Sequence, residues 1–169
     1  SIMSQSSTHP LVSVVIPHYG DTDILGECLT SLNKCSYPNL EIIVVDNASP
    51  DGSVQFIKTN FPGINLIQSE YNRGFAGGCN FGAQHTAGEY LLILNNDTTH
   101  EPAWIDCLVK MMESNPKISS VQPKIKNYDN RDYFDYAGAC GGFMDKYCFP
   151  FARGRIFCTV EKDEGQYDE

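Results

Sequence analysis

The sequence lacks the features that mark membrane-spanning, secreted and nucleic-acid-binding proteins. No hydrophobic run approaches the roughly 18–20 residues that a membrane-spanning helix needs. The N-terminal residues lack the basic and then apolar pattern of a secretory signal. Positive charge is scarce, because 12 Lys and Arg face 21 Asp and Glu, and the net charge of −9 opposes non-specific binding to nucleic acid. A nucleotide-binding pocket remains compatible with this charge, since a metal ion and local dipoles can offset it.

Paired cysteine motifs are also absent. The seven cysteines are an odd number and include no CxxC pair. Cys28, Cys35, Cys79 and Cys107 lie in or beside helical patterns and are interpreted as reduced packing residues. This cysteine usage predicts a cytoplasmic location.

Length and composition fit one globular domain. The chain has 169 residues, of which 41% are hydrophobic and 20% charged, and this is enough for a sizeable core. Residues 1–10 are rich in Ser and Thr and are interpreted as a disordered or artificially added tail. We therefore expect the domain to occupy residues 11–169.

Hydrophobic patterning alternates between buried strands and amphipathic helices. A strand over 11–16 is expected to stop at Pro17, and Asp21 or Thr22 can cap the helix that follows. Such alternation with short links predicts an α/β domain with a mostly parallel sheet and right-handed crossovers. The further strands are expected over 40–45, 64–68, 90–94 and 119–123, with helices around 54–61 and 74–88 and from Pro102 onward. Beyond Lys124 the pattern weakens to loops and short strands, and 161–169 is interpreted as an acidic terminal stretch.

The most informative segment is the fourth strand with the residues after it. Leu91 to Leu94 are four successive aliphatic residues, which predicts burial on both faces of a sheet. Asn95, Asn96 and Asp97 follow at once. Oxygen-bearing side chains at a strand end suit a hard divalent cation, which can hold a diphosphate. The alternative is an ordinary turn that uses Asn and Asp.

Polar residues follow each of the first four predicted strands. Because ligands of open α/β sheets bind outside the carboxyl ends of the strands, we expect these residues to share one site. They are His18, Tyr19 and Asp21 after the first strand, Asp46, Asn47, Ser49 and Asp51 after the second, Asn72 and Arg73 after the third, and Asn95, Asn96 and Asp97 after the fourth.

Four segments together resemble a known family. Residues 13–19, 43–53, 72–82 and 91–97, in this order, are similar to the N-terminal part of family 2 glycosyltransferases, most of all to rhamnosyltransferase-like enzymes of bacterial surface polysaccharide assembly. The resemblance covers roughly residues 11–140. It implies a GT-A fold, that is, a Rossmann-like three-layer sandwich of the nucleotide-diphospho-sugar transferases, incomplete here at the C-terminal end.

The resemblance also implies roles for residues that bind the nucleotide. Tyr19 would lie beside the base, where its aromatic face can stack, and Pro17 and Asn96 would contribute to the same site. Asp46 would accept a hydrogen bond from the ring N–H of a uracil-like or thymine-like base, the alternative being a turn carboxylate. Arg73 would contact phosphate, or is simply solvated. Two neighbours of Asp46, Ser49 and Asp51, either shape this pocket or cap the next helix, and capping is favoured.

A metal site is implied at Asp97, which matches the last aspartate of the family's DxD motif. It would bind Mg²⁺ or Mn²⁺, which neutralises the departing nucleoside diphosphate. The sequence departs from the motif at Asn95, where a neutral amide replaces the first aspartate. This lowers the ligand charge available to the metal.

The catalytic residue remains unknown from the sequence. Inverting transfer needs a carboxylate to accept the acceptor's proton, and the acidic motif that carries this base in the family has no convincing match here. Asp163, Glu164, Asp168 and Glu169 lie in a terminal run, which is more often a solvated tail. Since the family's domain is also longer, the chain is interpreted as the donor-binding part of a larger enzyme.

The resulting hypothesis is an inverting glycosyltransferase of cell-surface polysaccharide synthesis. It would move a sugar from a UDP- or dTDP-linked donor to a saccharide or lipid-linked acceptor, in the cytoplasm or in peripheral association with the inner face of the membrane. The alternative is a non-catalytic sugar-nucleotide-binding or interaction module. A nucleotidyltransferase is disfavoured because no Gly-rich basic loop follows the first strand, and a dehydrogenase because GxGxxG is missing there.

Overall fold

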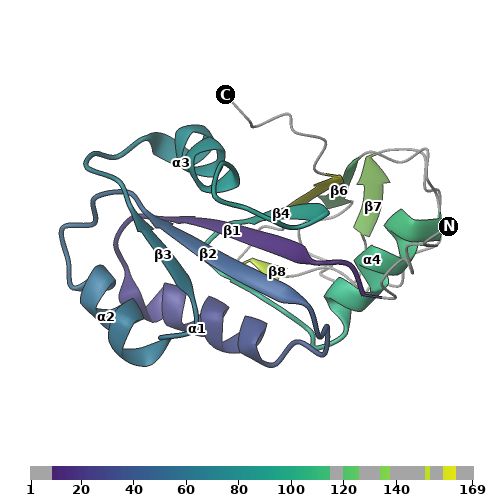
Figure 1. The fold of residues 1–169 in the computed structure, drawn as a ribbon, viewed down its shortest axis with the longest axis horizontal. Coiled ribbons are helices and arrows are strands. Elements are labelled where there is room, and N and C mark those ends of the chain that lie inside the picture. The colour runs from purple at the N-terminus through teal and green to yellow at the C-terminus, as the bar shows by residue number, and fades with distance from the viewer. Residues whose placement is uncertain (1–8, 115–119, 126–133, 138–150, 153–157, 163–169) are drawn as a thin grey trace, which may run out of the picture.

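The computed structural model describes residues 9–114, 120–125, 134–137, 151–152 and 158–162. Within these ranges a single seven-stranded sheet has the order β3-β2-β1-β4-β9-β6-β7, of which β3, β2, β1 and β4 are labelled in Figure 1. A small two-stranded sheet joins β5 to β8. The elements are β1 Val12–His18, α1 Thr22–Asn33, β2 Leu40–Asp46, α2 Ser53–Asn60, β3 Asn65–Gln68, α3 Gly74–Ala83, β4 Tyr90–Leu94, β5 Thr98–Thr99, α4 Trp104–Ser114, β6 Ser120–Ile125, β7 Phe134–Ala137, β8 Phe151–Ala152 and β9 Cys158–Lys162.

The sheet is mostly parallel, as the sequence predicts. β1 pairs in parallel with β2 and with β4, and β2 pairs in parallel with β3. β9 runs antiparallel to both β4 and β6, which leaves β6 in the common direction, and β7 is again antiparallel. The carboxyl ends of β1, β2, β3 and β4 therefore meet at one edge of the sheet.

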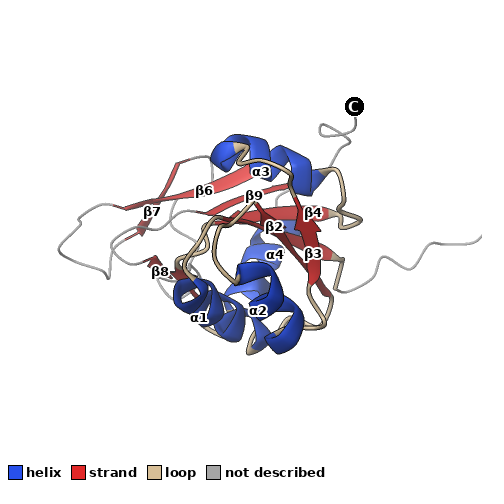
Figure 2. Cartoon of the chain, turned by 90° about the vertical axis from the view of Figure 1, so that its left-hand side faces the viewer, coloured by secondary structure: helices blue, strands red, loops and turns tan. Residues whose placement is uncertain are grey.

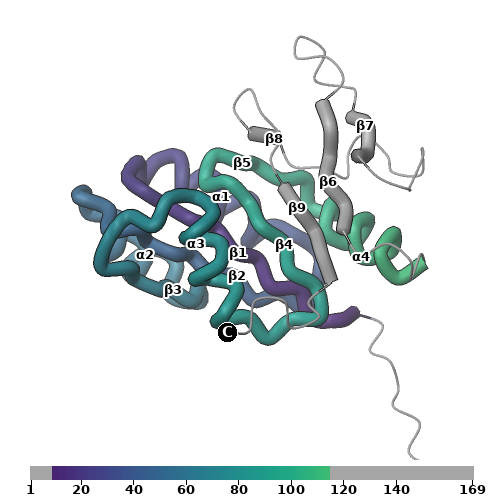
Figure 3. Tube along the Cα trace, turned by 90° about the horizontal axis from the view of Figure 1, so that it is seen from above, coloured from purple at the N-terminus to yellow at the C-terminus, as the bar shows by residue number. Residues whose placement is uncertain are grey.

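Helices cover both faces of the sheet and make three layers (Figure 2). The helices α1, α2 and α4 pack on one face, where the larger hydrophobic core lies. The helix α3 lies on the opposite face across β1 and β2, over a smaller core (Figure 3). The strand β1 is buried along its whole length and supplies both cores, since Val14 and Ile16 belong to the larger one and Val15 to the smaller. The first predicted strand is therefore the strand that separates the two cores.

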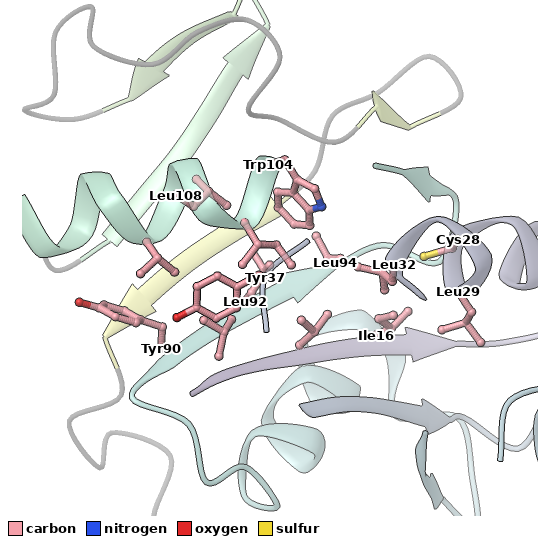
Figure 4. Close-up of a cluster of buried hydrophobic side chains, with 14 of the residues drawn as sticks. Ile16, Cys28, Leu29, Leu32, Tyr37, Tyr90, Leu92, Leu94, Trp104 and Leu108 are labelled. Carbon is pink, nitrogen blue, oxygen red and sulfur yellow. The ribbon is translucent and has the colours of Figure 1, made fainter. Parts of the chain in front are cut away.

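The larger core joins the strands that carry the site to the helices behind them. Ile16 of β1 and Leu94 of β4 pack with Leu29 of α1 and with Trp104 and Leu108 of α4 (Figure 4). All five side chains are at most 1% exposed. Burying an aliphatic or aromatic side chain of this size contributes about 1.5–3 kcal/mol. The positions at which β1 and β4 end are therefore fixed by core packing.

Some predicted boundaries were wrong. β1 continues through Pro17 to His18, because Pro17 pairs in register with Val45 inside the parallel ladder. The third helix ends at Ala83, before the expected Gly88, because Gly88 lies against the backbone of β1: an added Cβ would be 2.7 Å from the nitrogen of Ser13. Such close approach is available only to glycine.

The strand β9 falls in the region beyond Lys124 where loops and short strands were expected, but its position and its pairing were not predicted. It includes Glu161 and Lys162, which were assigned to an acidic terminal stretch, and it lies between β4 and β6 in the sheet. Residues 163–169 and the tail over 1–8 lie outside the described residues. In the part of the chain that the structure describes, no helix combines the length and apolarity needed to cross a bilayer.

Candidate functional site

The polar residues predicted after the first, second and fourth strands lie at the same edge of the sheet. His18 is in register with Asp46, and Asn47 N donates to the His18 carbonyl over 2.8 Å. The end of β3 joins the same edge, since Ser69 N donates to the Asp46 carbonyl over 2.9 Å. Because β1 lies between β2 and β4, His18 at the end of β1 is flanked by the end of β2 on one side and the end of β4 on the other.

Asp46 presents one carboxylate oxygen without a partner. The residue is 2% exposed, its Oδ2 accepts from Ser49 N over 3.1 Å, and its Oδ1 is buried with no hydrogen-bond partner in the described structure. Leaving a buried acceptor unpaired costs about 1–3 kcal/mol, more for a charged group. Asp46 is therefore a turn carboxylate through one oxygen and remains available to a ligand N–H through the other.

The loops next to Asp46 are tied together by side chains. Ser49 Oγ accepts from Gly20 N over 2.9 Å, so Ser49 joins the β2–α2 loop to the β1–α1 loop instead of capping a helix, which corrects the favoured prediction. Asp51 does serve the start of α2, since it accepts from Ser53 N over 3.0 Å and from Ser53 Oγ. Asp21 caps α1 by accepting from Ile24 N over 3.1 Å, as predicted.

Backbone strain is present in these same two loops. Asp21 and Ala48 are the only non-glycine residues with positive φ in the described structure, at 64° and 59°. Left-handed conformations are disfavoured for residues with a Cβ and concentrate at functional sites. The strain lies beside Tyr19 and Asp46, the two residues predicted to bind a base.

Two residues near the end of β1 that were predicted to bind the nucleotide differ in accessibility. The side chain of Tyr19 is 53% exposed just beyond the end of the strand, which leaves an aromatic face free to stack. Pro17 is buried and packs against α3, where a Cβ added to Gly78 would come within 3.1 Å of it. Pro17 therefore presents no ring face to a base, and a contact from this residue would have to come from its backbone.

Arg73 is held by its neighbours and is not simply solvated. Its guanidinium carbon lies 4.6 Å from the ring centroid of Tyr71 and 4.2 Å from that of Phe81. Its Nε donates to Ser69 Oγ over 2.8 Å. Arg73 N is in turn 3.4 Å from Asn47 Oδ1, so the buried Asn47 fixes the start of α3, a role that the sequence did not reveal.

The residues after β4 form a turn fixed on two sides. Thr98 Oγ1 donates to the Asn95 carbonyl over 2.9 Å, and Asn96 Nδ2 lies 3.0 Å from His18 Nδ1. Asp97 Oδ1 is buried without a hydrogen-bond partner in the described structure. Asp97 therefore keeps one carboxylate oxygen unpaired at the turn where the sequence predicted oxygen ligands.

The residues present fit a metal that takes most of its ligands from a substrate. Within the described ranges, no three or more His, Cys, Asp or Glu side chains gather as a metal cluster. Mg²⁺ is commonly bound by one or two carboxylates together with substrate phosphates and water. The single carboxylate of Asp97, with its unpaired Oδ1, is consistent with that arrangement.

His18 is one of the strand-end residues expected to share the site, and the structure places it between the other strand ends. Its ring is buried, with Nε2 2.9 Å from Ser53 Oγ and Nδ1 facing Asn96. Desolvation by burial lowers the pKa of His18, against the opposing effect of Asp46 and two other carboxylates. The side chain is therefore neutral near pH 7.

A second histidine, which is half-buried, contacts the turn after β4. His100 stacks on Trp104 with 4.7 Å between ring centroids, and its Nε2 lies 3.1 Å from Thr98 Oγ1. Burial lowers the pKa of His100 to about 3 and raises that of the neighbouring Cys28 thiol to about 12. A thiol with so high a pKa is a poor nucleophile. The described cysteines Cys28, Cys35, Cys79 and Cys107 are free, as predicted.

Comparison with known proteins agrees with this geometry. The chain belongs to glycosyl transferase family 2, whose sequence pattern it matches over residues 13–160. A curated relative, an uncharacterized glycosyltransferase of Haemophilus influenzae, is 31% identical over 115 residues, which are 66% of this chain and 36% of the relative. The rhamnosyltransferase-like subgroup is not distinguished by these matches.

Solved structures share the fold. A mannosyltransferase of Pyrobaculum calidifontis in complex with GDP-Man and Mn²⁺ has a TM-score of 0.65 and 26% identity, covering 73% of this chain and 38% of that one. TarS of S. aureus in complex with UDP-GlcNAc has a TM-score of 0.56 and 27% identity, covering 62% and 31%. The fold is thus the predicted GT-A fold, and this chain spans about a third of the length of the proteins named here.

Proposed function

We propose that this chain is the donor-binding part of an inverting glycosyltransferase that uses a UDP- or dTDP-linked sugar. The observation that carries the proposal is the unpaired, buried Oδ1 of Asp46 at the carboxyl end of β2. A ring N–H of a bound base would satisfy this oxygen. The exposed ring of Tyr19 follows the neighbouring strand and supplies a surface on which the base can stack.

The choice of a pyrimidine base rests on which oxygen of Asp46 already accepts a hydrogen bond. Its Oδ2 is committed to Ser49 N, which leaves a single oxygen for the base. Uracil and thymine present one ring N–H, whereas guanine presents an N–H and an adjacent amino group that together match a carboxylate with both oxygens free. The structural neighbours bind GDP-Man in one case and UDP-GlcNAc in another, so nucleotide titrations decide this point.

The diphosphate would lie toward the end of β4. Asp97 would hold Mg²⁺ or Mn²⁺ together with the diphosphate, and Asn96 and Arg73 are the further residues proposed to contact the donor. When bound, such an ion stabilises the negative charge that develops on a leaving diphosphate. The chain's own contribution is to orient the donor through the base contact and to place its diphosphate beside Asp97.

The acceptor is proposed to be a saccharide or a lipid-linked saccharide of cell-surface polysaccharide synthesis. The free state of the four described cysteines supports a reducing compartment, here the cytoplasm, with peripheral association with a membrane when the acceptor is lipid-linked. The general base that inversion requires is not assigned to any residue.

One observation favours a second function, a non-catalytic sugar-nucleotide-binding module. Asn95 replaces the first aspartate of the metal motif, which lowers the ligand charge available to a metal ion. Such a module would bind the nucleotide sugar and leave it intact. Incubation of the full-length protein with a radiolabelled sugar donor, Mn²⁺ and candidate acceptors separates the two, since only a transferase moves the label to an acceptor and releases the free nucleoside diphosphate.

The donor site itself is tested by isothermal titration with UDP, dTDP and GDP, each with Mn²⁺ and with EDTA. We expect UDP or dTDP to bind more tightly than GDP and the binding to require the metal. A preference for GDP would contradict the pyrimidine assignment, and a folded chain that binds none of the three would contradict the donor site.

A further inference from the structure

His18 connects two parts of the site that are far apart in the sequence. Its backbone is fixed in the ladder between β1 and β2, and its ring is 1% exposed. Nδ1 lies 3.0 Å from Asn96 Nδ2, beyond the end of β4, and Nε2 lies 2.9 Å from Ser53 Oγ, in the first turn of α2. No role in the proposed function has yet been given to this residue.

The partners of His18 determine how its hydrogen bonds run. A neutral imidazole has one donor and one acceptor nitrogen, and the amide nitrogen of Asn96 can only donate. Ser53 Oγ donates its single hydrogen to Asp51 and must therefore accept from Nε2. Nε2 then carries the ring proton, and Nδ1 is the acceptor that faces Asn96. Four side chains thus form one chain of hydrogen bonds with a consistent direction.

This chain fixes the orientation of the Asn96 amide. With Nδ2 committed to His18, Oδ1 is left as the atom that a ligand can use, and it has no donor in the described structure. A rotated amide would present N–H groups instead, which repel a cation and cannot accept from a hydroxyl. Asn96 directly precedes Asp97, so its orientation matters where the donor's diphosphate and metal are proposed to lie.

We propose that His18 is a positioning residue that holds Asn96 with its amide oxygen toward the nucleotide-sugar donor, an inference that rests on the proposed function. His18 itself touches no ligand in this scheme. Its effect on the donor passes through Asn96, and the contact with Ser53 serves to hold the imidazole in the correct tautomer.

Two substitutions of His18 test the contacts of its two ring nitrogens one at a time. In His18→Asn the side-chain oxygen can take the place of Nδ1 and accept from Asn96, while the contact with Ser53 is lost. In His18→Gln the amide nitrogen can take the place of Nε2 and donate to Ser53, while the contact with Asn96 is lost. We expect His18→Asn to bind UDP with Mn²⁺ within about twofold of the wild type, and His18→Gln to bind about three- to tenfold more weakly, as the loss of one hydrogen bond predicts.

A double-mutant cycle with Asn96→Ala tests whether the effect passes through Asn96. If it does, His18→Gln in the Asn96→Ala background causes no further loss of UDP affinity. Additive losses, or equal affinities of the Asn and Gln variants, would overturn the positioning role. The control Ser53→Ala is expected to lower the melting temperature while leaving UDP affinity within about threefold. A wild-type chain that binds no nucleotide would instead overturn the proposed function, and this inference with it.

Discussion

The unpaired oxygen of Asp46 gives the sharpest prediction, because the substitution Asp46→Asn changes charge and hardly any volume. The amide oxygen can still accept from Ser49 N, so the turn after β2 is kept. The amide N–H₂ then replaces Oδ1 and faces the ring N–H of the base as donor to donor. A hydrogen bond to a charged acceptor contributes about 1.5–3 kcal/mol, so UDP affinity should fall on the order of ten- to a hundredfold at about 1.4 kcal/mol per tenfold change.

Asp46→Asn should not lower the stability of the ligand-free chain, although it lowers the affinity for UDP. Asp46 Oδ1 is buried without a partner, and a buried unpaired charge is more costly than a buried unpaired amide. We therefore expect Asp46→Asn to keep or raise the free energy of unfolding. Isothermal titration with UDP and urea denaturation followed by circular dichroism measure the two quantities on the same preparation.

A matched control is available in α1. Asp23 is exposed in the first turn of that helix, and Asp23→Asn should leave UDP affinity unchanged. Asp46→Asn that binds UDP as tightly as the wild type would refute the base contact. A loss of affinity accompanied by an equal loss of folding stability would refute the argument that Oδ1 is held free for a ligand.

Three further predictions follow from the same geometry. Asp97→Ala should abolish the gain in UDP affinity that Mn²⁺ produces, measured by titrations with the metal and with EDTA. Gly82→Ala should lower the free energy of unfolding by about 1–3 kcal/mol, because the added Cβ would lie 2.5 Å from Val15 Cγ1. A lower melting temperature would show this loss. The pKa of His100 is about 3 in the folded chain against 6.5 when unfolded, so stability should be full above pH 6.5 and be lost as pH falls toward 3, because only the unfolded chain takes up the proton. In His100→Gln the free energy of unfolding should decrease less as the pH falls from 6.5 toward 3.

The outcomes that would contradict these predictions are equally direct. Metal-enhanced binding that persists in Asp97→Ala would place the metal elsewhere. Gly63→Ala is the control for Gly82, since nothing lies within 4 Å of its added Cβ, and equal melting temperatures for the two variants would refute the packing argument. If the stability of His100→Gln decreases with falling pH as steeply as that of the wild type, groups other than His100 govern acid unfolding.

Most of the fold was predictable because its signals are local. The parallel strands β1, β2 and β4 are short apolar runs, and each helix between them has an apolar face and a turn signal within a few residues. β9 could not be found in this way. Its register with β4 pairs Tyr90 with Lys162, and its last residues carry charges that resemble those of a solvated tail.

The site was predictable only as far as strand ends determine it. The order of the strands brings Asp46 and Asp97 to one edge, and the position of each follows directly from the end of a buried strand. The contact between His18 and Asn96 spans 78 positions and depends on the exact direction of two side chains, which no local pattern specifies. The same holds for Arg73, whose partner Phe81 is on the following helix.

The central claim is that the carboxyl edge of β1, β2 and β4 binds a metal-bound nucleoside diphosphate. The most direct test is the ¹H–¹⁵N NMR spectrum of the chain with UDP, recorded with Mg²⁺ and then with a trace of paramagnetic Mn²⁺. We predict that UDP shifts the amides of residues 18–20 and 46–49, and that Mn²⁺ broadens the amides around Asp97 most strongly. Shifts confined to the opposite edge, around Leu40 and Asn65, or Mn²⁺ broadening centred away from Asp97, would contradict the account.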